Sequence, residues 1–315
     1  MIEQRNIGKS GLRVSQIGLG CNNFGRSLDL TASRPVIHKA LDLGITFFDC
    51  ADVYGRRGGA ETILAEVLGP RRKDIVLATK FGRAMDDEGR LKGGSRRYIF
   101  TAIEASLKRL KTDWIDLYQY HLHDPLTPIE ETVRALDDLV RQGKVRYVGC
   151  SHLPAWLVVD ALWHARADHL SGFIACEDEY NVLERDIEHE LLPAIAAHGL
   201  GLLPYYPLAS GLLTGKYRRG EPYPPGSRFD TIKDRDYAGR FVTEANWTRL
   251  ERLTGFAEAR GHRLLELAMS WLMANPLVSC VIAGATKAEQ VEENVQAATW
   301  ALTRAEMEEI DRLCT

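Results

Sequence analysis

The feature that most constrains the fold of this chain is a regular alternation of short apolar runs with longer amphipathic segments. The runs have the length and composition of buried strands, whereas the segments between them repeat apolar residues at three- and four-residue spacing, as helices do. Eight runs are predicted as strands: 16–20, 47–49, 75–80, 115–121, 145–151, 173–176, 201–205 and 279–283. Helices are predicted at 33–43, 61–68, 98–110, 129–142, 155–165, 188–198 and 264–275.

This alternation predicts an α/β fold with a parallel sheet, either a closed (β/α)8 TIM barrel or an open doubly wound sheet. No predicted strand is followed by the G-x-G-x-x-G turn of the open dinucleotide-binding sheet, which favours the barrel. Polar residues also gather at the carboxyl ends of the runs, where a barrel places its active site. They are Asp49, Lys80, His121, Ser151, Glu177 and Tyr205.

The rest of the chain is assigned around this barrel. Residues 7–14 contain Gly-Lys-Ser-Gly and are predicted to form a hairpin, and 215–246, rich in Gly, Pro, Arg and Asp, an ordered loop or lid on the active-site rim. All 315 residues are predicted to form a single domain.

Composition excludes several classes of function. The formal net charge is −3, without the basic excess that nucleic-acid binding requires. The sequence has neither a signal peptide nor an apolar stretch that could span a bilayer, so we expect a cytoplasmic protein with no membrane partner. Six cysteines lack any C-x-x-C pairing, which predicts reduced, buried thiols and no metal site.

Four polar residues near the ends of neighbouring strands suggest carbonyl chemistry. Reduction of a carbonyl needs a proton donor at the oxygen, and a phenol donates poorly unless its pKa is lowered, for example by a nearby ammonium. That ammonium needs an anionic partner, and an imidazole beside the oxygen polarises the carbonyl. The candidate catalytic residues are Asp49, Tyr54, Lys80 and His121.

The sequences around these residues are Phe-Asp-Cys-Ala-Asp-Val-Tyr-Gly (48–55), Ala-Thr-Lys (78–80) and Asp-Leu-Tyr-Gln-Tyr-His (116–121). They resemble motifs of the aldo-keto reductase family, and similar matches extend over nearly the whole chain. The resemblance implies a barrel that binds NADPH without a metal and reduces a small aldehyde or ketone. Tyr54 would be the general acid, Lys80 and Asp49 would tune it, and His121 would lie at the carbonyl.

The resemblance also implies cofactor contacts around the rim. Gly20, Cys21, Asn22 and Asp49 would contribute from the first strands, and Tyr205 would stack on the nicotinamide. A pyrophosphate segment would contain Leu208, Ser210, Gly211 and Lys216. An adenosine site would contain Gly284, Thr286, Lys287, Gln290, Glu293 and Asn294.

Two positions depart from the family pattern. The family commonly has Ser-Asn after the fifth strand and Gln at the end of the sixth, which hold the nicotinamide carboxamide. Here Ser151 keeps the serine, whereas His152 replaces the Asn and Glu177 replaces the Gln. A carboxylate can accept from the carboxamide and a neutral imidazole can donate to it, so we expect these residues to retain cofactor binding with an altered pH dependence.

Several alternatives stay open at this level. Lys80 could be the nucleophile of a Schiff-base aldolase, although Asp49 would keep it charged, and the barrel could be a redox sensor that binds NADPH with little turnover. Thr286 and Lys287 favour NADPH, whereas Glu293 could instead bind a ribose hydroxyl and favour NADH. Candidate substrate-lining residues are Asn23, Phe24, Tyr54, Phe81, His121, His123 and the 215–246 segment. The substrate and the oligomeric state, including a homo-oligomer, are not specified.

Overall fold

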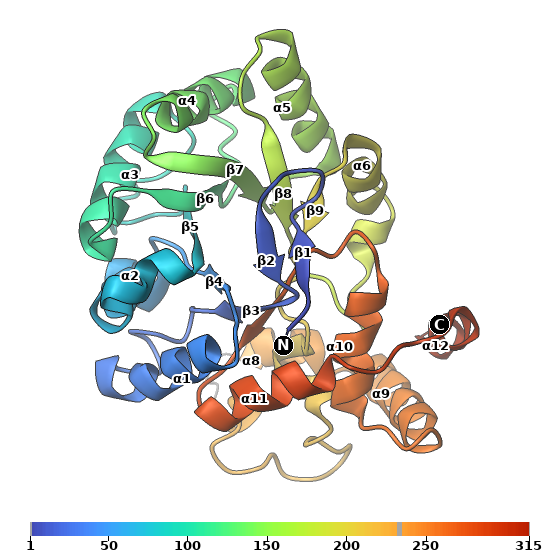
Figure 1. Ribbon diagram of the computed structural model, residues 1–315. Helices are drawn as coiled ribbons and strands as arrows, with labels where there is room; N and C mark the ends of the chain where they lie inside the picture. The colour runs from blue at the N-terminus through green and yellow to red at the C-terminus, as the bar shows by residue number, and fades with distance from the viewer. Residues whose placement is uncertain (1, 232–234, 315) are drawn as a thin grey trace.

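Eight parallel strands follow one another around the molecule in the order in which they occur in the chain (Figure 1). The computed structural model describes residues 2–231 and 235–314. The strands are β3 (Ile17–Gly20), β4 (Phe47–Asp49), β5 (Val76–Phe81), β6 (Ile115–Tyr120), β7 (Val145–Ser151), β8 (Phe173–Glu177), β9 (Gly201–Leu202) and β10 (Val281–Gly284). A doubly wound sheet reverses its strand order at a switch point, so this sequential order excludes that alternative.

Backbone hydrogen bonds join the two ends of the sheet. The amide of Leu202 in β9 donates to the carbonyl of Leu277 at 2.8 Å, and the amide of Ser279 donates back to the carbonyl of Leu202 at 2.9 Å. Because residues 277–279 lead directly into β10, and β10 pairs with β3, the strands close into a ring. The predicted (β/α)8 barrel is therefore confirmed.

An antiparallel hairpin of β1 (Gln4–Asn6) and β2 (Arg13–Ser15) covers the amino-terminal end of the barrel, as Figure 1 shows. Ile7 and Val14 are fully buried and belong to the cluster of apolar side chains that contains Phe47 and Leu117 from the strands. The hairpin predicted over 7–14 is thus confirmed. Since it covers the amino-terminal end, the active-site rim lies at the carboxyl ends of the strands.

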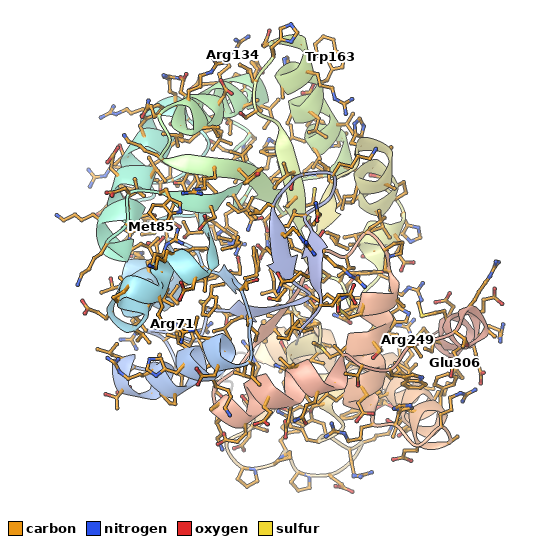
Figure 2. All side chains as sticks on the ribbon, viewed as in Figure 1. Arg71, Met85, Arg134, Trp163, Arg249 and Glu306 are labelled. Carbon is orange, nitrogen blue, oxygen red and sulfur yellow. The ribbon has the colours of Figure 1, made fainter. Side chains whose placement is uncertain are left out.

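A ring of helices surrounds the strands (Figure 1). The larger of the two apolar clusters lies between these helices and the barrel wall. The ring contains α1 (Leu30–Asp42), α2 (Tyr54–Leu68), α3 (Arg96–Leu110), α4 (Ile129–Arg141), α5 (Ala155–Ala167), α6 (Leu191–His198), α10 (Leu264–Ala274) and α11 (Ala288–Ala297). The outer faces are mainly polar: Arg134 of α4, for example, is exposed and lies at the outer edge of the molecule in Figure 2. None of the described helices is long and apolar enough to cross a bilayer.

The segment 215–246 is more helical than expected. It contains α7 (Arg228–Thr231) and α8 (Arg235–Phe241), and α9 (Glu244–Glu258) begins within it. The rings of Tyr217 and Phe229 lie 4.9 Å apart, so α7 packs against the start of the same segment. The aromatic residues of this segment do not repeat at helical spacing along the chain, so the sequence pattern did not reveal these helices. Residues 232–234 of the proposed lid lie outside the described residues. The sequence analysis also missed α12 (Arg304–Cys314).

Candidate active site

Three of the four candidate catalytic residues end consecutive strands. The register aligns Asp49 of β4 with Ala78 of β5, and Lys80 of β5 with Gln119 of β6. His121 follows β6 directly, and its amide donates to the carbonyl of Phe81 at 2.9 Å. Because neighbouring parallel strands end at the same edge, these side chains share one rim of the barrel.

Lys80 lies at the centre of this group. Its Nζ is 2.6 Å from Asp49 Oδ1 and 3.1 Å from the carbonyl oxygen of Cys50, and its side chain is entirely buried. The same nitrogen lies 5.2 Å from the centroid of the Tyr54 ring. The Tyr54 and His121 ring centroids are 6.0 Å apart, with the rings nearly perpendicular. The four residues singled out in the sequence are thus brought together.

A left-handed backbone turn holds Tyr54 over the strand ends. Residues 55–58, within α2, all have positive φ angles, so the regular right-handed part of the helix begins only after Gly58. A Cβ at Gly55 would lie 2.4 Å from the backbone nitrogen of Ala60 and 2.6 Å from the carbonyl oxygen of Phe24. Gly55 is therefore required for both its φ angle and its lack of a side chain. The expected loop after β4 corresponds to this turn.

The phenol of Tyr54 differs from expectation in its electrostatics. Burial raises the pKa of Tyr54 above its ordinary value, and the positive charge of Lys80 only partly offsets that effect. The expectation that Lys80 lowers the pKa of the phenol below its ordinary value is wrong, because desolvation of the phenolate is the larger effect. The hydroxyl consequently stays protonated and able to donate.

Burial and neighbouring charges shift the pKa values of Lys80 and His121. Burial opposes the charge on Lys80, but Asp49 and Glu177 together raise the pKa of Lys80 well above its usual value. Burial, together with the positive charges of Lys80 and Arg83, lowers the pKa of His121 well below its usual value. The site therefore contains a charged ammonium beside a neutral imidazole whose buried Nδ1 has no partner in the described part of the chain.

The sequence analysis missed the contact between Glu177 and Lys80. Glu177 Oε1 lies 3.0 Å from Lys80 Nζ, and Glu177 Oε2 accepts a 2.6 Å hydrogen bond from Gln119 Nε2. Both carboxylate oxygens already have protein partners inside the barrel, whereas we had expected one to face a carboxamide. The sequence did contain a signal for polar contacts in the barrel interior. Gln119 is two residues before His121, so strand alternation places its polar side chain on the same inward face.

Arg83 is a second residue that the sequence analysis missed. It is half-buried just beyond β5, and its buried Nε has no hydrogen-bond partner among residues 2–231 and 235–314. Its positive charge contributes to the lowered pKa of both His121 and His152.

Two of the expected substrate-lining residues do not line the site. Phe24 and Phe81 are fully buried in the layer between helices and strands, and Phe81 stacks on Tyr118 with ring centroids 4.8 Å apart. Phe81 directly follows Lys80, so strand alternation turns its side chain to the opposite face of the barrel wall. His123 lies farther out, with its ring against the exposed Trp156.

The expected nicotinamide residues lie beside the catalytic group. The ring of His152 lies 6.1 Å from that of His121 and 5.3 Å from that of Tyr205. The hydroxyl of Ser151 donates to the backbone carbonyl of Glu177 at 2.7 Å. His152 and Tyr205 thus form a half-buried aromatic surface next to the strand ends.

The expected pyrophosphate residues lie in and after the short helix η3 (Ala209–Thr214), which follows the half-buried Leu208. Ser210 and Gly211 have φ angles of 57° and 96°, and the Ser210 hydroxyl lies 2.6 Å from that of Tyr237. The ammonium of Lys216 is exposed and has no carboxylate within salt-bridge distance in the described structure. This arrangement leaves a cation available on the rim.

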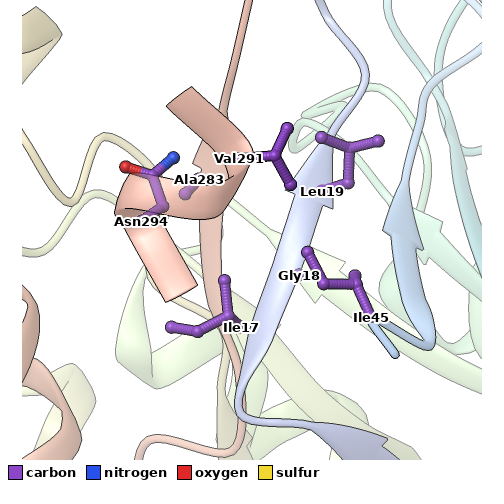
Figure 3. Close-up of a pocket in the computed structure, with 7 residues that line it drawn as sticks. All are labelled: Ile17, Gly18, Leu19, Ile45, Ala283, Val291 and Asn294. Carbon is purple, nitrogen blue, oxygen red and sulfur yellow. The ribbon is translucent and has the colours of Figure 1, made fainter. Parts of the chain in front are cut away.

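The expected adenosine residues surround the start of α11. The amide and hydroxyl of Thr286 both donate to Gln290 Oε1, at 2.7 and 3.1 Å. Lys287 is the exposed N-cap residue. Asn294, in contrast, is buried and lines a small apolar pocket between α11 and the barrel (Figure 3). Glu293 is exposed on the outer side of the helix.

The remaining expected cofactor residues, Gly20, Cys21 and Asn22, lie at and just beyond the carboxyl end of β3. Gly20 pairs with Gly284 across the β3–β10 register, and Asn22 lies half-buried just beyond it. The thiol of Cys21 is fully buried and donates to the carbonyl of Leu19. All six cysteines are buried and unpaired, which confirms that part of the sequence analysis. No cluster of metal-ligating side chains occurs among the described residues.

Comparison with known proteins covers almost the entire chain. Residues 16–314 match the family model described as the aldo/keto reductase family. A probable voltage-gated potassium channel subunit beta from Oryza sativa subsp. japonica is 39% identical over 94% of this chain and 91% of its own length. L-glyceraldehyde 3-phosphate reductase from Escherichia coli (strain K12) is 37% identical over 94% of this chain and 87% of its own. An uncharacterized oxidoreductase from Bacillus subtilis is 36% identical over 94% and 91%.

Proposed function

The chain belongs to the aldo/keto reductase family, and we propose that it uses NADPH to reduce the carbonyl group of a small aldehyde or ketone. The observation that carries this proposal is the placement of Lys80, salt-bridged to Asp49 and beneath the ring of Tyr54, with His121 alongside. A charged ammonium, a protonated phenol and a neutral imidazole converge on one rim of the barrel, where this reaction needs them.

Each residue has a distinct role in this proposal. The cofactor, when bound, supplies the hydride to the carbonyl carbon. Tyr54 donates the proton to the carbonyl oxygen, and its raised pKa keeps that proton in place until charge develops on the oxygen. His121, neutral because it is buried beside cations, polarises the same oxygen. Asp49 holds the ammonium of Lys80, whose charge stabilises the phenolate that remains.

The residues present fit a dinucleotide with phosphates at two places. Lys216 and Lys287 are exposed ammonium groups from separate loops, and neither has a carboxylate within salt-bridge distance in the described part of the chain. Phosphate oxygens are suitable partners for such groups. The flat ring of Tyr205 offers a surface for the nicotinamide, with the ring of His152 tilted by 50° beside it. A cytoplasmic location and a homo-oligomeric state stay predictions.

Turnover with NADPH and with NADH against a panel of aldehydes and ketones tests the proposal. Carbonyl-dependent oxidation of NADPH is expected. A second candidate, an NADPH-binding redox sensor with little turnover, is suggested by the similarity to a probable potassium channel subunit. It would be supported if the cofactor bound tightly and no carbonyl accelerated its oxidation. The aldolase alternative is disfavoured, because Asp49 and Glu177 keep Lys80 charged and poorly nucleophilic.

Substitution Lys287→Ala is expected to weaken use of NADPH selectively. The ammonium at the start of α11 would pair with the 2′-phosphate, which NADH lacks. The loss in kcat/KM should correspond to about 1.5–3 kcal/mol for a charge-assisted hydrogen bond. Steady-state kinetics with both cofactors provide the measurement. Lys216→Ala is the matched control, since a pyrophosphate contact should weaken NADPH and NADH alike. Equal losses with both cofactors in Lys287→Ala would remove this assignment.

Substitution Arg83→Gln is expected to lower activity selectively for substrates that carry an anionic group. The guanidinium has a buried Nε without a partner in the described part of the chain, and its charge lowers the pKa of His121 and His152, so it would bind a phosphate or carboxylate close to the carbonyl. Loss of a charge-assisted hydrogen bond corresponds to about a 10- to 100-fold decrease in kcat/KM. Glyceraldehyde 3-phosphate and glyceraldehyde form a matched substrate pair. An equal decrease for both substrates would show that Arg83 does not bind the anion.

A further inference from the structure

The left-handed turn that follows Tyr54 has a strained backbone. Residues 55–58 have φ angles of 67°, 61°, 69° and 106°. Glycine adopts such angles freely, but two of these residues are Arg56 and Arg57, whose Cβ atoms crowd the backbone there. A strained conformation of this kind persists only where the surrounding structure holds it. The contacts that hold the turn therefore bear on the position of the Tyr54 phenol.

An ion pair packs against this turn. Glu61 of α2 is fully buried, and its Oε2 accepts a 2.6 Å hydrogen bond from Nε of Arg109 in α3. Arg109 passes so close to the turn that a Cβ at Gly58 would lie 2.5 Å from its Cδ and 2.7 Å from its Nε. The guanidinium also donates to Ser106 Oγ at 3.0 Å. The side chain of Arg109 is thus fixed at both nitrogens and supports the turn.

The same pair is connected to the strand that carries Lys80. Glu61 Oε1 accepts a 2.7 Å hydrogen bond from Thr79 Oγ1, and Thr79 precedes Lys80 in β5. Strand alternation turns these two side chains to opposite faces of the barrel wall, so Thr79 faces the helices while Lys80 faces the interior. The amide of Asp52, two residues before Tyr54, donates to the carbonyl of Lys80 at 3.0 Å. Contacts therefore run without a break from α3 through α2 and β5 to the segment that carries Tyr54.

We propose that the Glu61–Arg109 ion pair is a positioning device that holds the left-handed turn against the barrel wall and thereby fixes the Tyr54 phenol over Lys80. This inference rests on the proposed function, in which Tyr54 donates the proton. Both residues of the pair lie on the helix side of the wall, so they act through the turn and not on the substrate. A displacement of about 1 Å at a reacting group can lower the rate by about 100-fold. Loss of the pair should therefore lower kcat without weakening cofactor binding.

Steady-state kinetics and NADPH titration of the double variant Glu61→Gln/Arg109→Met test this role. The two substitutions remove both charges together, so no buried carboxylate is left unpaired, and such replacements often leave stability unchanged. We expect kcat to fall about 10- to 100-fold, while the dissociation constant for NADPH stays within about twofold of wild type. Arg109→Lys keeps a cation that reaches Glu61 and should retain kcat near the wild-type value.

A second ion pair provides the matched control. Arg72 Nη2 lies 2.9 Å from Asp116 Oδ2, and both side chains are largely buried. Arg72 precedes β5 and Asp116 lies near the start of β6, so this pair is at the amino-terminal end of the barrel, away from the Tyr54 turn. Arg72→Met/Asp116→Asn should therefore leave kcat unchanged, whatever its effect on thermal unfolding. Hydrogen exchange of the backbone amides of residues 54–58 needs no turnover, and it should be faster in Glu61→Gln/Arg109→Met than in wild type.

The outcomes separate this inference from the proposed function. If Glu61→Gln/Arg109→Met keeps the wild-type kcat, or if kcat falls equally in the control, the pair is merely structural and the inference is wrong. If that variant does not fold, Arg109→Gln replaces it, because its amide keeps a donor for Glu61, and an unchanged kcat overturns the inference in the same way. If the wild-type protein reduces no carbonyl, it is the proposed function that fails. Exchange at residues 54–58 then decides, and a rate equal to that of wild type overturns the positioning role.

Discussion

Replacing Tyr54 by Phe is expected to reduce carbonyl reduction by about 10²- to 10⁴-fold while leaving cofactor binding intact. The substitution removes the hydroxyl but keeps the ring that covers Lys80 and meets the edge of His121. The proton donor is thereby lost without a change in packing. Turnover and a fluorescence titration with NADPH, made on the same preparation, measure the two halves of this prediction separately.

The pH profile gives an independent test of the same role. Burial raises the pKa of the Tyr54 phenol, and reduction requires its protonated form. At any pH below about 10, the ordinary pKa of tyrosine, ionisation of the phenol should therefore not reduce activity. Tyr206→Phe is a suitable control, because that neighbouring phenol has no assigned role in the reaction. Near-normal reduction by Tyr54→Phe, or an equal loss in Tyr206→Phe, would contradict the assignment.

Much of the fold and of the candidate site could be predicted because both depend on strand ends. Apolar runs of limited length locate buried strands, and a polar residue that terminates such a run must lie at the rim. Asp49, Lys80 and His121 were found in this way, and the structure brings them together. The predicted helices, such as α4, whose buried residues form one face, were located from apolar periodicity to within a few residues, whereas α9, α11 and α12 were not among them. The assignment of 1–315 to one domain stays a prediction.

The features that escaped prediction depend on contacts between distant parts of the chain. Lys80 and Glu177 lie on strands that are not neighbours in the sheet, so only the width of the barrel interior brings them within 3.0 Å. The sign of the pKa change at Tyr54 depends on the balance between burial and a nearby charge, and sequence reveals only the charge. The short helices within 215–246 likewise form against an aromatic cluster assembled by tertiary packing.

Replacing Lys80 by Met is expected to abolish most reduction and to destabilise the protein. Without the ammonium, nothing offsets the rise in the Tyr54 pKa, and the phenol becomes a weaker acid. Two buried carboxyl groups, Asp49 and Glu177, also lose their shared cation. Removing one partner from a buried ion pair costs about 3–5 kcal/mol of unfolding free energy. Lys144→Met, which breaks an exposed pair with Glu104, is the control and should cost about 1 kcal/mol or less.

The stability loss in Lys80→Met should depend on pH in a defined direction. Burial and the neighbouring Glu177 already raise the pKa of Asp49, and loss of Lys80 raises it further. The unfolded chain ionises its carboxyl groups near pH 4, so the folded variant binds more protons than the unfolded chain above that pH and loses stability as pH rises. Below about pH 4 both states are protonated and this contribution disappears. Urea unfolding of variant and wild type at pH 5 and at pH 8 should therefore show the larger deficit at pH 8. An equal deficit at both pH values would indicate that lost packing of the lysine side chain, rather than uncompensated carboxylate charge, causes the destabilisation.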